Sequence, residues 1–101
     1  MEHAKYALAT SSGMAATVTL MNLLNKDDHV LCVDDIHGGT MKYLQKVLGP
    51  NTQIEITFQD FSDVELFKRG LRPNTKYVWL ETPTNPTLKV FDIAKLAKVV
   101  K

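Results

Sequence analysis

Three short segments of the chain carry the residue types that could do chemistry. Ser11-Ser12-Gly13 joins an apolar run to a helical pattern, Asp34–Thr40 contains two carboxylates, two glycines and His37, and Glu81–Pro86 places Asn85 between two prolines. A helix start offers unpaired N–H groups and about half a positive charge. A glycine there lets a phosphate approach the main chain, and a flat imidazole can cover an aromatic ligand. The segments are therefore candidates for a binding site.

Each segment also has a plainer interpretation without a ligand. Ser12 could only cap a helix and Gly13 only turn the chain, and the segment matches neither Walker A nor GxGxxG. His37 could be a solvated loop residue, and the loop around Asn85 a rigid turn. A metal site built from Asp34-Asp35 and His37 is disfavoured, because consecutive residues at a strand end point in different directions. We therefore expect no metal site.

The elements that must position these segments alternate along the chain. Hydrophobic patterns predict strands at residues 5–10, 29–34, 53–58 and 76–81, and helices at 14–24, 41–48, 62–69 and 93–100. Gly49-Pro50 should end the second helix, a capping box of Ser62 and Glu65 should start the third, and Asp92 should cap the fourth. This order predicts an α/β fold with βα units on a mainly parallel sheet, and ligands beyond the carboxyl ends of its strands.

The composition is that of a single globular unit. The 101 residues are 45% hydrophobic and 23% charged, and we treat residues 1–101 as one domain. A net charge of +1 argues against a nucleic-acid binder, and no apolar run reaches the roughly 18 residues that would span a bilayer. The single cysteine, Cys32, is expected in the core and excludes an internal disulfide. With no signal peptide, we expect a cytoplasmic location.

Four sequence blocks, in this order, resemble one family closely. Glu2–Tyr6, Ser12–Thr17, Asp34–Thr40 and Glu81–Pro86 are similar to the Cys/Met-metabolism enzymes that use pyridoxal 5′-phosphate (PLP). Within that family the likeness is greatest to the cystathionine γ-lyases of eukaryotes, and it runs over essentially the whole chain. The resemblance implies that residues 1–101 are part of the large, PLP-binding domain of an aspartate-aminotransferase-like (fold type I) enzyme.

The same resemblance implies roles for the candidate site residues. Ser12, Gly13 and Met14 would hold the PLP phosphate, with the main-chain N–H groups of Gly13 and Met14 as donors. Glu81 would lie near the edge of the cofactor ring. Asn85 would hydrogen-bond the phenolic oxygen of the cofactor.

His37 is where the sequence departs from the family pattern. The resemblance implies that this residue lies over the pyridine ring, a position that the family usually gives to tyrosine. An imidazole can stack on the ring but covers less of it, and it lacks the tyrosine hydroxyl. We expect cofactor affinity and turnover to differ at this position.

The resemblance implies a PLP-dependent carbon–sulfur lyase with an amino-acid substrate, working as a cytoplasmic homotetramer. The reaction would convert cystathionine to cysteine, 2-oxobutyrate and ammonia in transsulfuration, a route of cysteine biosynthesis, while γ-synthase and β-lyase action stay open. The Schiff-base lysine and the aspartate that binds the pyridine nitrogen would lie beyond residue 101. We therefore expect the chain alone to contain no catalytic residue, to lack lyase activity and to bind PLP or phosphate weakly and non-covalently.

Two other functions stay open. The chain could be a non-enzymatic fragment that associates with a full-length relative, because part of a parallel sheet leaves an edge strand and an apolar face unpaired. It could also be a Rossmann-like nucleotide binder.

The PLP hypothesis makes two structural predictions: His37, Asn85 and the Gly13 amide converge on one pocket, and Asn85-Pro86 is a candidate cis peptide.

Overall fold

The centre of the molecule is a three-stranded parallel sheet. The computed structural model describes residues 3–100, so Met1, Glu2 and Lys101 of the predicted domain lie outside the described residues. The strands β1 (His29–Val33), β2 (Glu55–Gln59) and β3 (Thr75–Trp79) lie in the order β2-β1-β3, close to three of the predicted ranges. Every residue of β1 is buried, as expected for an apolar run paired at both edges.

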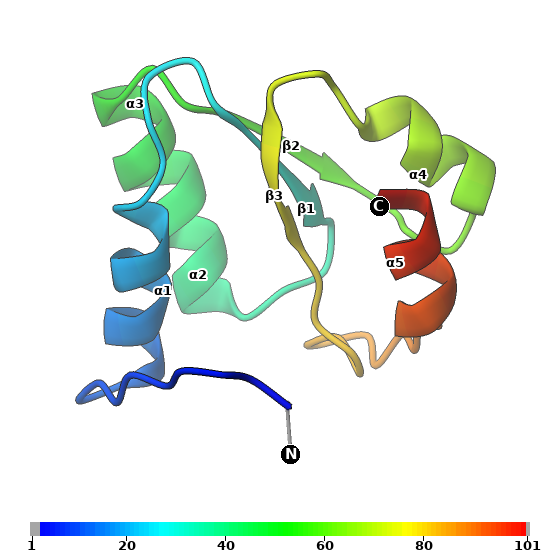
Figure 1. Cartoon of the computed structure of the whole chain (residues 1–101), viewed down its shortest axis with the longest axis horizontal. Helices are drawn as coiled ribbons and strands as arrows, with labels where there is room; N and C mark the ends of the chain where they lie inside the picture. The colour runs from blue at the N-terminus through cyan, green and yellow to red at the C-terminus, as the bar shows by residue number, and fades with distance from the viewer. Residues whose placement is uncertain (1–2, 101) are drawn as a thin grey trace.

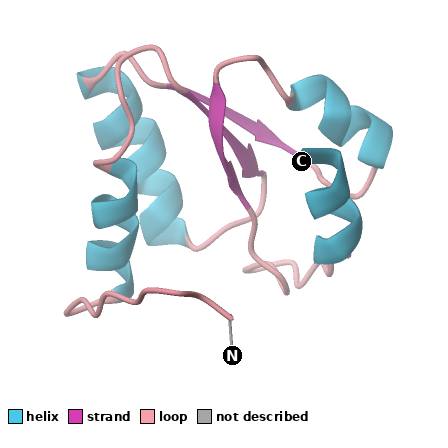
Figure 2. Ribbon diagram, in the orientation of Figure 1, coloured by secondary structure: helices cyan, strands magenta, loops and turns pink. Residues whose placement is uncertain are grey.

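Helices cover both faces of this sheet. On one face lie α1 (Gly13–Met21) and a continuous helical segment made of α2 (Gly38–Lys42), η1 (Tyr43–Leu48) and α3 (Gly49–Asn51); on the other lie α4 (Val64–Gly70) and α5 (Ile93–Val100) (Figure 1, Figure 2). The predicted α/β class with a parallel sheet is confirmed. No helix among residues 3–100 has both the length and the apolar character needed to cross a bilayer.

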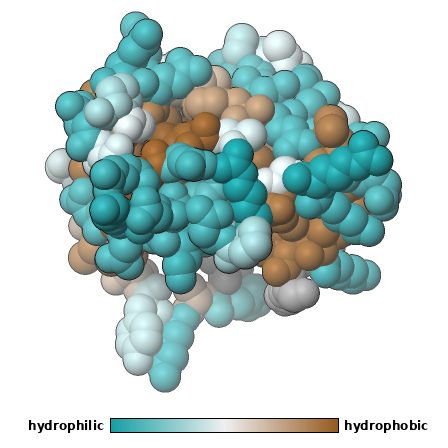
Figure 3. Space-filling view, turned by 90° about the horizontal axis from the view of Figure 1, so that it is seen from above, coloured by the Kyte–Doolittle hydropathy of each residue, from teal (hydrophilic) through white to brown (hydrophobic). Residues whose placement is uncertain are grey.

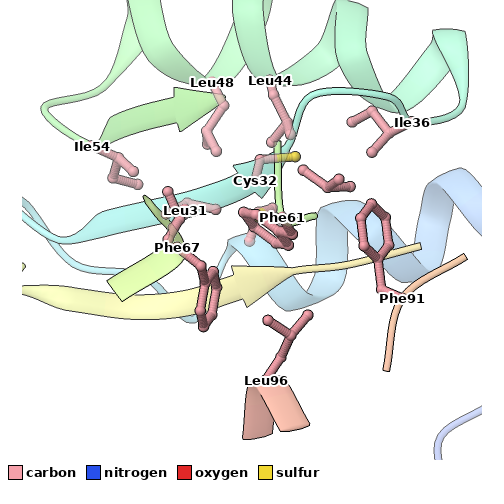
Figure 4. Packing of buried hydrophobic residues seen from close by; sticks show 13 residues of the cluster. Leu31, Cys32, Ile36, Leu44, Leu48, Ile54, Phe61, Phe67, Phe91 and Leu96 are labelled. Carbon is pink, nitrogen blue, oxygen red and sulfur yellow. The ribbon is translucent and has the colours of Figure 1, made fainter. Parts of the chain in front are cut away.

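The hydrophobic core fills the space on both sides of β1. Leu44 and Leu48 lie on one side of the strand, and Phe67 and Leu96 on the other (Figure 4). Cys32 belongs to this core, as predicted. Burial, with a smaller effect of nearby carboxylates, raises the pKa of the Cys32 thiol to about 12, so the sulfur stays protonated and unreactive at neutral pH.

The strand predicted at Lys5–Thr10 is wrong. This segment is extended but unpaired, and each of its residues is exposed, including Tyr6 at 81% and Leu8 at 78%. A strand needs a neighbour for its backbone N–H and C=O groups, and the sheet of the described residues is built from three other segments. An apolar pattern alone cannot tell whether such a neighbour exists.

The predicted helix end at Gly49-Pro50 is also wrong. The helix passes through both residues by widening into the π-helical turn η1 and continuing as α3. The Gly49 N–H donates to the carbonyl of Leu44, five residues earlier. Pro50 has no N–H to contribute, and the wider turn accommodates a residue that would break a regular α-helix.

The start of α4 differs by one residue from the predicted capping box. Asp63, not Ser62, is the N-cap, and its carboxylate accepts hydrogen bonds from the Glu65 and Leu66 N–H groups. Ser62 instead donates to Asp60. The predicted cap of the last helix is confirmed, since Asp92 accepts from the Lys95 N–H at 3.0 Å.

Candidate functional site

Three loops meet at the carboxyl ends of the strands and enclose a hollow of about 480 Å³. The start of α1, the start of α2 and the loop after β3 lie at the same end of the molecule (Figure 1). The residues that line the hollow are Ser12, Gly13, Met14, Thr17, His37, Thr40, Trp79 and Glu81. The structure thus brings five of the six predicted site residues together, at the end of the sheet where a ligand was expected.

The first wall is the start of α1. Ser12 has an extended backbone (φ −159°, ψ 165°), and its Oγ accepts a hydrogen bond from the Ala15 N–H at 3.1 Å, so it does cap the helix. The N–H groups of Gly13 and Met14 have no hydrogen-bond partner among residues 3–100. Open space lies where a Gly13 Cβ would be. Ser12 can therefore cap the helix while the same helix start binds an anion. The cap leaves the Gly13 and Met14 N–H groups and the positive helix end free beside the hollow.

The second wall is the start of α2 and the third is the loop after β3, and Glu81 holds these two walls together. Its carboxylate accepts hydrogen bonds from the His37 N–H at 3.1 Å and from the Trp79 Nε1–H at 3.3 Å. The imidazole of His37 needs Gly39 as its neighbour, since a Cβ on Gly39 would lie 2.8 Å from the His37 Cε1. Glu81 thus fixes the backbone at His37, and Gly39 leaves room for the ring.

Asn85 is the predicted site residue that does not line the hollow. The predicted convergence of Asn85 with His37 and the Gly13 amide is therefore only partly met: Gly13 and His37 share the hollow, while Asn85 is exposed on the loop after β3. Both Thr82-Pro83 and Asn85-Pro86 are cis, the second as predicted. Proline restrains the backbone but does not decide which neighbour turns inward, and here that residue is Thr84.

Sequence reasoning missed three residues of the lining, Thr17, Thr40 and Trp79. The Thr17 hydroxyl donates to the Gly13 carbonyl at 3.1 Å. The helical repeat places Thr17 one turn after Gly13, and the two-residue repeat of a strand places Trp79 on the same side as Glu81. These two periodicities could have identified Thr17 and Trp79 as lining residues. Trp79 both lines the hollow and packs against the hydrophobic core.

The acidic loop after β1 uses its carboxylates for hydrogen bonds and ion pairs. Asp35 accepts from Thr84 and Thr87, which lowers the pKa of Asp35, and Asp34 lies 3.5 Å from the Lys89 Nζ. Among residues 3–100 no group of three or more His, Cys, Asp or Glu side chains is placed to hold a metal ion. The contacts of Asp35 tie the loop after β1, which leads into α2, to the loop after β3.

The chain is similar to known proteins over its whole length. The family described as Cys/Met metabolism PLP-dependent enzyme matches residues 1–101. Human cystathionine γ-lyase is 46% identical over 100 residues, which cover 99% of this chain and 24% of that protein. A probable cystathionine γ-synthase of Herpetosiphon aurantiacus is 43% identical over 101 residues, which cover 100% of this chain and 31% of that protein.

A solved structure agrees with these sequence relatives. The crystal structure of metB from Corynebacterium glutamicum superposes with a TM-score of 0.90 at 43% identity, covering 98% of this chain and 26% of that one. The chain spans about a quarter of the length of the first curated relatives that it matches. With a family match over every residue and the α/β fold of these relatives, the chain belongs to the Cys/Met-metabolism family of PLP-dependent enzymes.

Proposed function

We propose that this chain supplies the phosphate-binding and ring-facing part of a PLP-dependent carbon–sulfur lyase that acts on cystathionine. Family membership and the human relative named cystathionine γ-lyase support the proposal. The observation that carries it is local. The unpaired N–H groups of Gly13 and Met14 lie at the same hollow as His37 and Glu81.

The residues present fit the cofactor. A phosphate is matched by the two free N–H groups of Gly13 and Met14, by the Ser12 hydroxyl and by the positive end of α1. The hollow of about 480 Å³ falls within the roughly 300–1,000 Å³ of small-molecule sites. His37 and Trp79 offer flat side chains for an aromatic ring. PLP, when bound, supplies an electron sink for negative charge on the amino-acid substrate.

Two residues have proposed roles near the cofactor ring, Glu81 and Asn85. Glu81 is already engaged by the His37 and Trp79 N–H groups, so it orients the walls near the ring edge. The family resemblance supports a role for Asn85, which is exposed on the loop that Glu81 begins: its amide would donate to the phenolic oxygen of the bound cofactor. Among residues 3–100 no lysine lines the hollow, so we propose that this chain binds the cofactor non-covalently.

The experiment that tests this site uses Trp79, the only tryptophan of the chain, as a reporter. Titration with pyridoxine 5′-phosphate, whose alcohol cannot form a Schiff base with surface lysines, should quench Trp79 fluorescence. Gly13→Pro should weaken this binding roughly tenfold, because it removes one N–H donor at a helix position that tolerates proline.

Gly13→Ala is the matched control. It keeps the N–H, and its Cβ would meet no protein atom, so its affinity should lie well above that of Gly13→Pro. Any loss relative to the wild type measures how closely the phosphate approaches the main chain. Equal affinity of the Gly13→Pro variant, or a wild-type chain that binds neither pyridoxine 5′-phosphate nor phosphate, would show that the start of α1 is not a phosphate site.

We further propose a homotetramer in the cytoplasm as the setting of the complete reaction. The family resemblance supports the tetramer, and a single buried cysteine is in keeping with a reducing compartment. Sedimentation and fractionation test the two statements separately.

A second candidate function is association with a full-length relative. It is favoured by an apolar hollow of about 400 Å³ between β3, α4 and α5, lined by Phe67, Val78, Leu80, Ile93, Leu96, Ala97 and Val100. Hydrophobic residues, drawn in brown, reach the surface of the molecule in the view from above (Figure 3). Co-elution with cystathionine γ-lyase during size exclusion, without binding of pyridoxine 5′-phosphate, would favour this second function.

A further inference from the structure

The carboxylate of Asp35 ties the loop that carries Asn85 to the end of β1. Its Oδ2 accepts hydrogen bonds from the Thr84 hydroxyl at 2.5 Å, the Thr87 N–H at 3.0 Å and the Thr87 hydroxyl. Asp35 is 9% exposed and Thr84 only 1%. Hydrogen bonds to a charged, buried carboxylate are among the stronger ones in proteins, so this contact holds the loop firmly.

The loop is closed on itself around Thr84. The Thr84 N–H donates to the Lys89 carbonyl at 2.9 Å, and the Lys89 N–H donates back to the Thr84 hydroxyl at 2.8 Å. The Leu88 N–H donates to the Thr84 carbonyl at 3.1 Å. Residues 84–89 therefore form one closed turn, and Asn85 follows directly after Thr84, a residue that Asp35 holds.

A second carboxylate joins the same two loops in the opposite direction. Glu81, at the start of the loop after β3, accepts from the His37 N–H, while Asp35, in the loop after β1, accepts from Thr84 and Thr87. The separation of the two loops is thus set at two points. One point lies at the hollow, and the other lies beside Asn85.

We propose that Asp35 is a positioning residue for cofactor binding, which holds Asn85 in place through Thr84 and Thr87 without touching the ligand. The inference rests on the proposed function, in which Asn85 contacts the cofactor ring and the start of α1 its phosphate. Asp35 should therefore affect recognition of the ring and leave recognition of the phosphate unchanged.

The test compares two probes on the 101-residue chain by isothermal titration calorimetry. Asp35→Asn should weaken binding of pyridoxine 5′-phosphate roughly tenfold, because it weakens the hydrogen bonds that hold the loop. Binding of inorganic phosphate should not change. Thr84→Val should behave like Asp35→Asn, and Thr84→Ser, which keeps the hydroxyl, should behave like the wild type.

A double-mutant cycle separates positioning from a general structural role. In an Asn85→Ala background, Asp35→Asn should cause no further loss of pyridoxine 5′-phosphate affinity, since its effect passes through Asn85. Additive losses, or an equal loss of inorganic phosphate affinity, would overturn the proposal.

Amide hydrogen exchange tests the loop contact independently of any ligand. Exchange at Thr87 and Lys89 should become faster in Asp35→Asn and stay slow in Thr84→Ser. If the wild-type chain binds neither probe, the proposed function fails and the cofactor role of Asp35 with it. Unchanged exchange in Asp35→Asn would instead show that Asp35 does not hold the loop.

Discussion

His29 is a titratable side chain at the start of the central strand β1, with no exposed surface. Its Nδ1 lies 2.7 Å from the Thr75 Oγ1 and its Nε2 lies 3.0 Å from the Thr57 Oγ1, so both ring nitrogens are satisfied by neighbouring strands. Burial, together with the positive charge of Arg72, lowers the pKa of His29 below 6.5, against an opposing effect of Glu55. The folded chain therefore prefers a neutral imidazole.

This preference predicts a pH dependence of stability. The unfolded chain binds a proton at His29 more readily than the folded chain, so the free energy of unfolding should fall as the pH decreases below about 6.5. Urea denaturation between pH 7.5 and about 5.5 measures the slope. The same series on His29→Gln should be flatter, and a slope equal to that of the wild type would contradict the assignment to His29.

Single residues also show what could be predicted of the site. Ser12, Gly13 and His37 could be identified from residue type and position, because a helix start and a strand end have a fixed place in an α/β fold. Asp35 and Thr84 could not, because their pairing joins positions 49 residues apart and depends on which neighbour of a proline turns inward. Long-range hydrogen bonds of this kind have no local signature.

Among the elements, β1 and α1 were the most predictable. A run of apolar residues specifies a strand that is buried on both faces, and a helical repeat specifies α1. The unpaired segment Lys5–Thr10 and the helix that continues through Gly49-Pro50 were predicted wrongly. The apolar pattern of Lys5–Thr10 does not show whether a pairing strand exists. The sequence Gly49-Pro50 does not show that a π-helical turn lets the helix continue.

The start of α4 gives a prediction at the same scale. Asp63→Ala should lower the free energy of unfolding by about 1 kcal/mol, because the carboxylate accepts from two N–H groups at the helix start. Ser62→Ala, the control, removes only an exposed contact to Asp60 and should cost clearly less. Chemical denaturation of both variants checks the order, and a larger cost for Ser62→Ala would contradict the observed cap.

For the whole molecule, the proposed lyase function can be tested in a chimera. Residues 1–101 would replace the matching quarter of human cystathionine γ-lyase, with which they share 46% identity. The chimera should release 2-oxobutyrate from cystathionine but hold PLP less tightly than the parent. His37→Tyr should restore about 0.5–1.5 kcal/mol of cofactor binding, the range for an aromatic pair.

Release of 2-oxobutyrate and the PLP dissociation constant are the two measurements for this chimera. Circular dichroism and gel filtration confirm that it folds. A folded chimera that binds PLP and yet leaves cystathionine intact, with His37 and with tyrosine alike, would contradict the lyase function.

The hollow at the strand ends is built from segments that are distant in the chain, with His37 and Glu81 44 residues apart. It consequently vanishes when the sheet melts, and any compound that fills it binds the native form alone. By mass action, a ligand at about 100 times its dissociation constant adds about 2.7 kcal/mol to the unfolding free energy. The supply of that compound would then govern how long the polypeptide survives proteolysis, as well as what it can bind.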